Sequence, residues 1–254
     1  MAETKAYQTF RGESDWLNVA LQLMDVSIKG TNRLLGKEYK HGDKTKTIAE
    51  ALSTTVAEHP HLNHQVRQYE SVVGQTRNKM TEYAVNYLYV LWTNYLHSLL
   101  KEMVRHNSNS IIFLNSIDRT INIGGIPIEE LTDLNSSIKI RKTIVKKVYC
   151  HIESISSSRK LMKALLDHTN INVPQATQDD AFGYLDIRNL LIHNHGFVDR
   201  NFIDKYRGRF PGWRAGQKVV RSYQLYCDMF NAINTLCKTI DAALIRDGFV
   251  TPIH

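Results

Sequence analysis

Cysteine, proline and glycine are scarce in this chain of 254 residues, and it contains no long apolar run. Its 3 cysteines, Cys150, Cys227 and Cys237, are odd in number and lack Cys-x-x-Cys spacing, which argues against a disulfide framework or a zinc–thiolate site. The 5 prolines and 13 glycines favour helices over a turn-rich β-sandwich. The polar first residues lack the apolar core of a signal peptide, so we expect a soluble, reduced, cytoplasmic protein with no membrane partner.

Apolar residues recur at three- and four-residue spacing along almost the whole chain, which predicts an all-α fold. Helices are expected at about residues 14–35, 47–58, 62–73, 76–105, 137–155, 158–168, 176–194 and 222–246. The helix at 76–105 is apolar on several sides, so we expect several neighbouring helices or a partner subunit to bury it. Between residues 107 and 137 the pattern is broken, and 126–131 could form a short strand or a loop.

Residues that favour helix ends place some of these boundaries. Ser14 or Asp15 is the expected cap of the first helix, and Gly36 is its expected end. Thr177 followed by Asp180 resembles a capping box with Asp in place of Glu at the start of the helix 176–194.

The helix 176–194 contains an arginine in an unexpected position. Arg188 falls in the middle of an apolar stripe made by Ala181, Tyr184, Leu185, Leu191 and Ile192. An unpaired buried guanidinium is costly, so Arg188 should either pair with a buried carboxylate or line a cleft that binds an anion. From this position alone, both interpretations stay open.

A histidine follows this arginine by five positions. His193 lies near the expected end of the helix, where the negative end of the helix dipole favours a charged imidazole. An arginine that binds phosphate and a histidine that exchanges protons suffice to cleave RNA, because the RNA 2′-hydroxyl supplies the nucleophile. Such a site needs no metal. The spacing alone is a weak signal, since it arises often by chance.

The segment 186–199, Asp-Ile-Arg-Asn-Leu-Leu-Ile-His-Asn-His-Gly-Phe-Val-Asp, resembles the signature of HEPN domains, all-helical modules named for higher eukaryotes and prokaryotes nucleotide binding. Ribonuclease members of this family carry arginine, usually a polar residue next, then four to six residues and histidine. These positions match Arg188, Asn189 and His193. The residues after His193 resemble one prokaryotic branch, and the order of helices is similar over about 76–246.

The resemblance implies a HEPN-like helical bundle at 76–254, with residues 1–75 as additional N-terminal helices packed on this core. It implies a homodimer in which two Arg-x4-His motifs form one composite endoribonuclease site that uses no metal and no cofactor. Such enzymes act in anti-phage defence, toxin–antitoxin or RNA-processing settings, so a neutralising antitoxin or a regulatory protein is a possible partner.

Residue roles follow from the same resemblance. His193 would be the general acid and base, Arg188 would bind the scissile phosphate, and Asn189 would orient these groups or the substrate. Asn194 and His195 are auxiliary candidates. His195 stands where one subgroup of the family has tyrosine, so nucleotidylation of that tyrosine is not expected here.

The net charge of +7 identifies no partner by itself, but its placement does. Between residues 200 and 221 there are seven basic residues and one acid, interleaved with aromatic residues that suit single-stranded RNA. The predicted RNA contacts in this segment are Arg200, Lys205, Arg207, Arg209, Trp213 and Arg214. A second basic cluster, interpreted as a solvated helix face, consists of Lys139, Arg141, Lys142, Lys146 and Lys147.

The same residues also admit other functions. The sequence His193-Asn194-His195 spells H-N-H, but no ββα-metal pattern surrounds it, and no carboxylate or thiol stands at a spacing that would complete a metal site. A non-catalytic module that binds a nucleotide or RNA as a sensor is one alternative. A dimeric scaffold in which Arg188 forms an interface ion pair is another.

Overall fold

The computed structural model describes residues 2–106 and 158–253. They form mainly helices, and backbone pairing between extended segments is limited to isolated bridges. The predicted all-α fold is confirmed. The helices are α1 (Lys5–His41), α2 (Ile48–Ala51), η1 (Pro60–Leu62), η2 (Val66–Gln68), α3 (Tyr69–His106), α7 (Ser158–Thr169), α8 (Gln175–His193), α9 (Arg200–Lys205) and α10 (Tyr223–Arg246).

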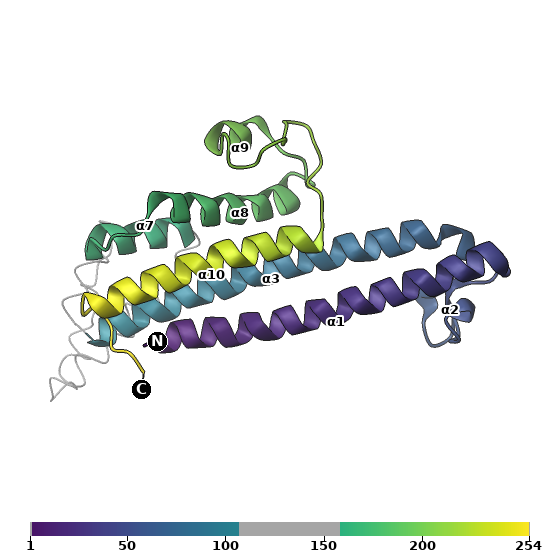
Figure 1. The fold of residues 1–254 in the computed structure, drawn as a ribbon, viewed down its shortest axis with the longest axis horizontal. Helices are drawn as coiled ribbons and strands as arrows, with labels where there is room; N and C mark the ends of the chain where they lie inside the picture. The colour runs from purple at the N-terminus through teal and green to yellow at the C-terminus, as the bar shows by residue number, and fades with distance from the viewer. Residues whose placement is uncertain (1, 107–157, 254) are drawn as a thin grey trace, which may run out of the picture.

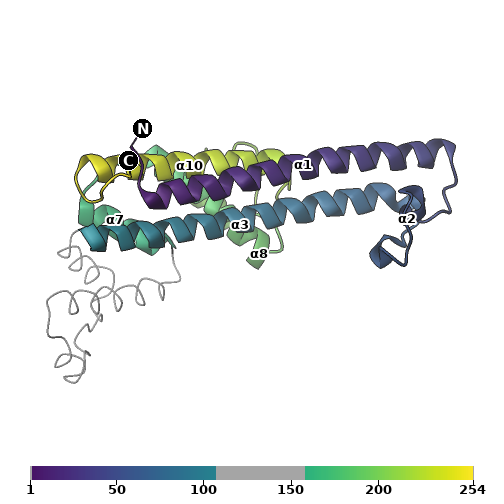
Figure 2. The ribbon, with the colours of Figure 1, turned by 90° about the horizontal axis from the view of Figure 1, so that it is seen from below.

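Two long helices form the frame of the molecule. α1 and α3 lie side by side and run in opposite directions, and α10 lies along the half of this hairpin that holds the N-terminus (Figures 1 and 2). α8 packs on α10 and α3, α7 packs on α3, and α9 lies over α8 on the side away from α10 (Figure 1). The other half of the α1–α3 hairpin extends past α8 and α10 and carries α2 at its end (Figure 1).

The core lies where α3 meets its neighbours. Trp92, Leu96 and Leu99 are fully buried, and the Tyr95 hydroxyl donates a 3.1 Å hydrogen bond to the carbonyl of Cys237 on α10. On α1, Tyr7, Phe10, Ser14, Leu17 and Leu21 follow a three- and four-residue spacing and are all buried. The predicted burial of α3 on several sides is therefore confirmed.

The first helix is longer than the sequence indicates. α1 begins at Lys5 with Thr4 as its cap, so the expected start at Ser14 or Asp15 is wrong. The expected end at Gly36 is also wrong, because the helix continues to His41 and ends at Gly42. Thr4 can act as the cap because its backbone nitrogen and hydroxyl donate to the buried carboxylate of Asp241, a contact between the two ends of the chain.

The segment between the two long helices contains less helix than predicted. Of the helix expected at 47–58, only α2 (Ile48–Ala51) forms. Thr47 and Glu50 make a capping box at its start. The helix expected at 62–73 is replaced by η1, η2 and the start of α3. α3 begins at Tyr69, so the position assigned to the domain boundary, between residues 75 and 76, lies inside a continuous helix.

The C-terminal helices agree better with the sequence. α7 and α10 match the predicted ranges within a residue, and Ser222 caps α10. α8 begins one residue before the predicted start, but the capping box of Thr177 and Asp180 is wrong because Pro174 precedes the helix without a side-chain cap. The helix expected at 137–155, the stretch 107–137 and the basic cluster of Lys139, Arg141, Lys142, Lys146 and Lys147 lie outside the described residues.

Candidate functional site

Arg188 is the central residue of the candidate site. It lies on α8 as a half-buried side chain, and its guanidinium carbon is 4.6 Å from the centroid of the Tyr89 ring on α3. Its Nη1 donates a 3.1 Å hydrogen bond to Oδ1 of Asn189, whereas its Nε is buried without a hydrogen-bond partner in the described structure. A cation over an aromatic face is stabilised by about 0.5–2 kcal/mol, which offsets part of the cost of burial.

Arg188 forms no ion pair with any carboxylate in residues 2–106 and 158–253. The acid of the same motif, Asp186, is already engaged, because its Oδ2 accepts from Lys205 Nζ at 2.8 Å, Tyr206 Oη at 2.7 Å and Arg159 Nη2 at 3.1 Å. Arg188 could be half of a buried ion pair, but no carboxylate in the described part of the chain pairs with it. The geometry instead leaves a cation with spare donor capacity.

Asn189 connects the acid to the arginine. Its Nδ2 lies 3.5 Å from Oδ1 of Asp186, and its Oδ1 accepts the hydrogen bond from Arg188. This chain of contacts fixes the side-chain amide so that its oxygen faces the guanidinium. Asn189 itself is exposed.

His193 is the last residue of α8 and is exposed. Residues five apart on an α-helix differ by about 140° in direction, so His193 leaves the helix on a different side from Arg188. Within the described residues, no hydrogen bond or ion pair joins the two side chains. In one copy of α8, the guanidinium of Arg188 and the imidazole of His193 therefore leave the helix in different directions.

The loop after His193 is held by a second arginine. Asn194 Nδ2 donates a 2.6 Å hydrogen bond to the Phe197 carbonyl, and His195 is exposed with a left-handed backbone, φ 53°. Gly196 follows with φ 80°, as expected for a residue after a helix end, and a side chain there would collide with Arg221. Arg221 Nη2 donates a 3.5 Å hydrogen bond to the His195 carbonyl, and its Nε lies 2.5 Å from Oε1 of Glu82 on α3, so Arg221 links the loop to the core.

Only part of the basic segment after the motif carries unpaired positive charge at the surface. Lys205 is paired with Asp186, Arg207 with Asp204, and Arg209 with Asp179 and Asp180 at the start of α8. Arg200 and Arg214 are exposed and form no ion pair within the described residues. The local excess of positive charge is therefore smaller at the surface than the sequence indicates.

The aromatic residues of this segment form a small core of their own. Phe202 lies against Phe210 and Trp213 with ring centroids 5.2 and 5.7 Å apart, and Trp213 is half-buried. Phe202 and Tyr206 are only 4% and 6% exposed, so neither ring offers a free face on which an RNA base could stack. Burial and the hydrogen bond to Asp186 raise the pKa of Tyr206 well above its ordinary value of 10. These rings attach the segment to α8.

The sequence does not reveal several residues that hold the site together. Tyr89 and Arg221 meet the motif only through tertiary packing, and no spacing in the chain indicates these contacts. Asp186 does have a local signal, since it precedes Asn189 by three positions and the two share a helix face. The sequence therefore does indicate an acid that lies two positions before the Arg-x4-His motif and on the same helix face as Asn189.

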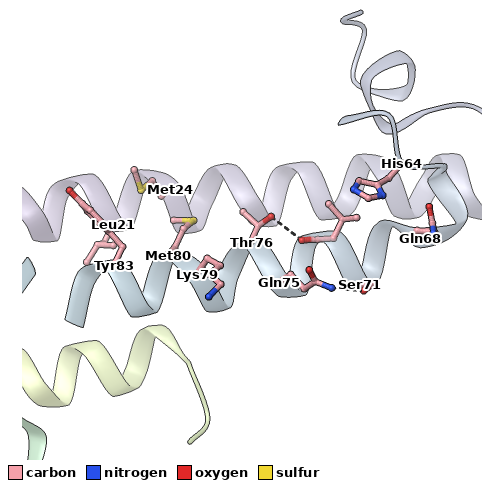
Figure 3. A pocket seen from close by; sticks show the side chains of 11 residues that line it. Leu21, Met24, His64, Gln68, Ser71, Gln75, Thr76, Lys79, Met80 and Tyr83 are labelled. Atoms are coloured by element: carbon pink, nitrogen blue, oxygen red, sulfur yellow. Dashed lines mark hydrogen bonds between the residues drawn. The ribbon is translucent and has the colours of Figure 1, made fainter. Parts of the chain in front are cut away.

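A cavity away from the motif lies between α1 and α3, in the part of the hairpin beyond α10. It measures about 790 Å³, and Figure 3 shows Met24, Met80 and Tyr83 along its apolar wall with Lys79 and His64 at its polar parts. No residue of the Arg-x4-His motif lines it. Its formation depends on the side-by-side packing of two helices distant in sequence, so the sequence gives no sign of it.

Across the described residues, no three His, Cys, Asp or Glu side chains gather in a group that could hold a metal ion. Among the helices described, none is long and apolar enough to cross a membrane. A search of known protein families, curated proteins and solved structures finds no match to this chain.

Proposed function

We propose that this protein is a metal-independent endoribonuclease with Arg188, Asn189 and His193 as its catalytic residues. The observation that carries the proposal is the state of Arg188, a half-buried guanidinium on an aromatic ring with no carboxylate partner in the described structure. A phosphate would supply the missing negative charge and accept the unused N–H donors. The HEPN-like segment 186–199 provides the second, independent support.

The chemistry assigns one role to each residue. Arg188 binds the scissile phosphate and stabilises the charge that develops on its oxygens in the transition state. His193 transfers the proton, taking it from the 2′-hydroxyl or giving it to the departing 5′-oxygen. As the 2′-oxygen bonds to phosphorus, the bond to the 5′-oxygen breaks, which yields a 2′,3′-cyclic phosphate and a 5′-hydroxyl. Asn189 positions Arg188 through its side-chain oxygen.

A second copy of the chain would complete this site. Arg188 and His193 leave one helix in different directions, so a single phosphate is flanked best by Arg188 of one copy and His193 of the other. Asn194 and His195 would stand beside the reacting phosphate, and Arg200 and Arg214 would contact the RNA backbone. We further propose that the protein acts in anti-phage defence or as a toxin, with a neutralising antitoxin as its partner.

The test is cleavage of single-stranded RNA by purified protein in EDTA, with analysis of the product ends. We expect cyclic phosphate ends from the wild type and a loss of at least 100-fold in rate for Arg188→Ala and for His193→Ala. Arg67→Ala and His61→Ala are matched controls, because both residues are exposed and lie outside the motif, and they should cleave at the wild-type rate.

Intact RNA with wild-type protein, or equal cleavage by the two motif variants, would contradict the catalytic proposal. RNA binding without cleavage, abolished by Arg188→Ala, would instead establish the sensor alternative. Loss of dimers in Arg188→Ala without any RNA activity in the wild type would establish the scaffold alternative.

A further inference from the structure

α1 is apolar on two opposite sides, and only one of them is covered. The inner side packs on α3 through Phe10, Leu17, Leu21 and their neighbours. The opposite side carries the outer stripe, which we define as Gly12, Trp16, Val19, Leu23, Val26, Gly30 and Leu34. At 100° per residue these positions fall within one narrow sector, roughly opposite the inner side.

The large residues of the outer stripe are solvent-exposed in the single chain. Trp16 is 72% exposed, Leu23 65% and Val26 67%, and Val19 and Leu34 are also exposed. α1 forms an outer edge of the bundle, and neither α3 nor α10 covers this side (Figures 1 and 2). A continuous exposed apolar strip on a long helix is typical of an interface rather than of a free surface.

The two glycines of the stripe have no explanation within the chain. A Cβ atom added to Gly12 or Gly30 would meet nothing within 4 Å, so alanine would fit at both positions. Glycine inside a helix costs about 1 kcal/mol relative to alanine. A close approach by another molecule would require the small residue at these positions.

Large and small residues of the outer stripe lie at matching distances on opposite sides of Leu23. Trp16 stands seven positions before Leu23 and Gly30 seven after it, while Gly12 stands eleven before and Leu34 eleven after. Two antiparallel copies of α1 related by a two-fold axis at Leu23 would therefore place Trp16 against Gly30 and Leu34 against Gly12 of the other copy. Val19 would lie within one residue, about 1.5 Å along the axis, of Val26 of the other copy, and Leu23 would face itself, as an isologous interface requires.

The charges beside the stripe fit the same arrangement. Asp15 and Arg33 lie on the same edge of α1, and neither forms an ion pair within the described residues. In the antiparallel pair, Asp15 of one copy and Arg33 of the second copy lie within about two residues, or roughly 3 Å, of each other along the axis. Opposite charges at this edge favour the antiparallel register over others.

We infer that the outer stripe of α1 binds the outer stripe of a second copy of this chain in an antiparallel helix pair centred on Leu23. This pairing does not rest on the proposed function. The stripe faces away from α3, whereas Arg188 contacts Tyr89 of α3, so the two motifs lie on the outer sides of the pair. The surface that would bring two motifs together is a different one, and both contacts can form in one assembly.

Sedimentation of the full chain at tens of micromolar tests the pairing, with helicity measured by circular dichroism for each variant. Leu23→Glu places two carboxylates at the two-fold axis, and Gly30→Leu fills the space for Trp16; we expect each to halve the mass of the wild-type particle. Gly74→Leu is the matched control, because Gly74 on α3 is equally open and lies outside the stripe. It should keep the wild-type mass.

Exchanging the charges of Asp15 and Arg33 gives a second test of the helix pair, and this test does not depend on apolar burial. Asp15→Arg should weaken the pair at low salt, and adding Arg33→Asp to the same chain should restore it. Wild-type protein with the mass of a single chain overturns the inference. Helical Leu23→Glu and Gly30→Leu variants that keep the wild-type mass also overturn it, since the copies would then associate through another face.

Discussion

The guanidinium of Arg188 on α8 lies 4.6 Å from the ring centroid of Tyr89 on α3, so the phosphate-binding cation of the proposed site is positioned by a neighbouring helix. The ring screens one face of the guanidinium from water and leaves its edge, which carries the N–H donors, for an anion. Asn189 holds the same guanidinium through Nη1. Tyr89 and Asn189 therefore restrict Arg188 from two directions before any substrate binds.

Replacing Tyr89 tests this arrangement. Tyr89→Leu removes the aromatic face, worth about 0.5–2 kcal/mol, so we expect kcat/KM for RNA cleavage to fall about 2- to 30-fold. Tyr89→Phe keeps the ring and should retain most of the activity. Tyr83→Leu changes an exposed tyrosine of the same helix and serves as the control. Equal losses for the Leu and Phe variants would show that the ring face does not position Arg188.

The free and the paired arginines of the basic segment should behave differently toward RNA. Arg214 is exposed and unpaired within the described residues, so Arg214→Ala should weaken RNA binding and reduce the slope of log K against log salt by about 0.7. Arg209 is paired with Asp179 and Asp180, so Arg209→Ala should mainly lower the free energy of unfolding, by about 1 kcal/mol. Binding titrations at several salt concentrations, with urea unfolding, separate the two. A larger salt effect from Arg209→Ala would contradict this division.

The sequence correctly predicts the helices whose ends depend on residues close by in the chain. Ser222 followed by an apolar pattern is enough to place the start of α10, and the residues of α7 show clear helical spacing. The start of α1 could not be predicted, because the Thr4 cap is stabilised by Asp241 near the other end of the chain. α2 is short although its capping box is clear, since few apolar residues follow Ala51 to bury a longer helix.

The same distinction holds for the candidate site. Arg188, Asn189 and His193 are adjacent on one helix, so their spacing is visible in the chain. Their environment is not visible, because Tyr89, Arg159 and Tyr206 reach the motif from α3, α7 and the end of α9. The aromatic residues after the motif suggest RNA stacking in sequence, whereas in three dimensions most of them pack on each other.

Gly183 tests the attachment of this aromatic segment to α8. A Cβ atom at Gly183 would lie 2.8 Å from the ring of Phe210, so the ring would have to move. We expect Gly183→Ala to lower the free energy of unfolding by about 1–3 kcal/mol despite the better helix propensity of alanine. Gly74→Ala, in open space on α3, should instead raise it by about 0.5–1 kcal/mol. Chemical denaturation measures both, and equal stabilisation by the two variants would show that Phe210 does not pack on α8.

Asp241 predicts how stability depends on pH. Burial raises its pKa above the ordinary value of 3.8, although hydrogen bonds from Thr4 oppose the shift, and Glu3 adds to it. The folded chain therefore binds this proton more tightly than the unfolded chain does. Stability should rise as the pH is lowered from neutral through the raised pKa, and this gain is lost as the pH increases again.

Substitution of Asp241 isolates that contribution from those of other carboxyl groups. Asp241→Asn cannot titrate, so the gain in the free energy of unfolding between pH 7 and pH 4, just above the ordinary pKa of 3.8, should be smaller than in the wild type. Some gain should persist, because burial also raises the pKa of Glu102. Asp247→Asn is the control: the contact with Arg246 lowers the pKa of Asp247, so its contribution is present above 3.8 and changes only at lower pH. If Asp241→Asn keeps the full wild-type difference, the buried carboxyl is not the group that titrates.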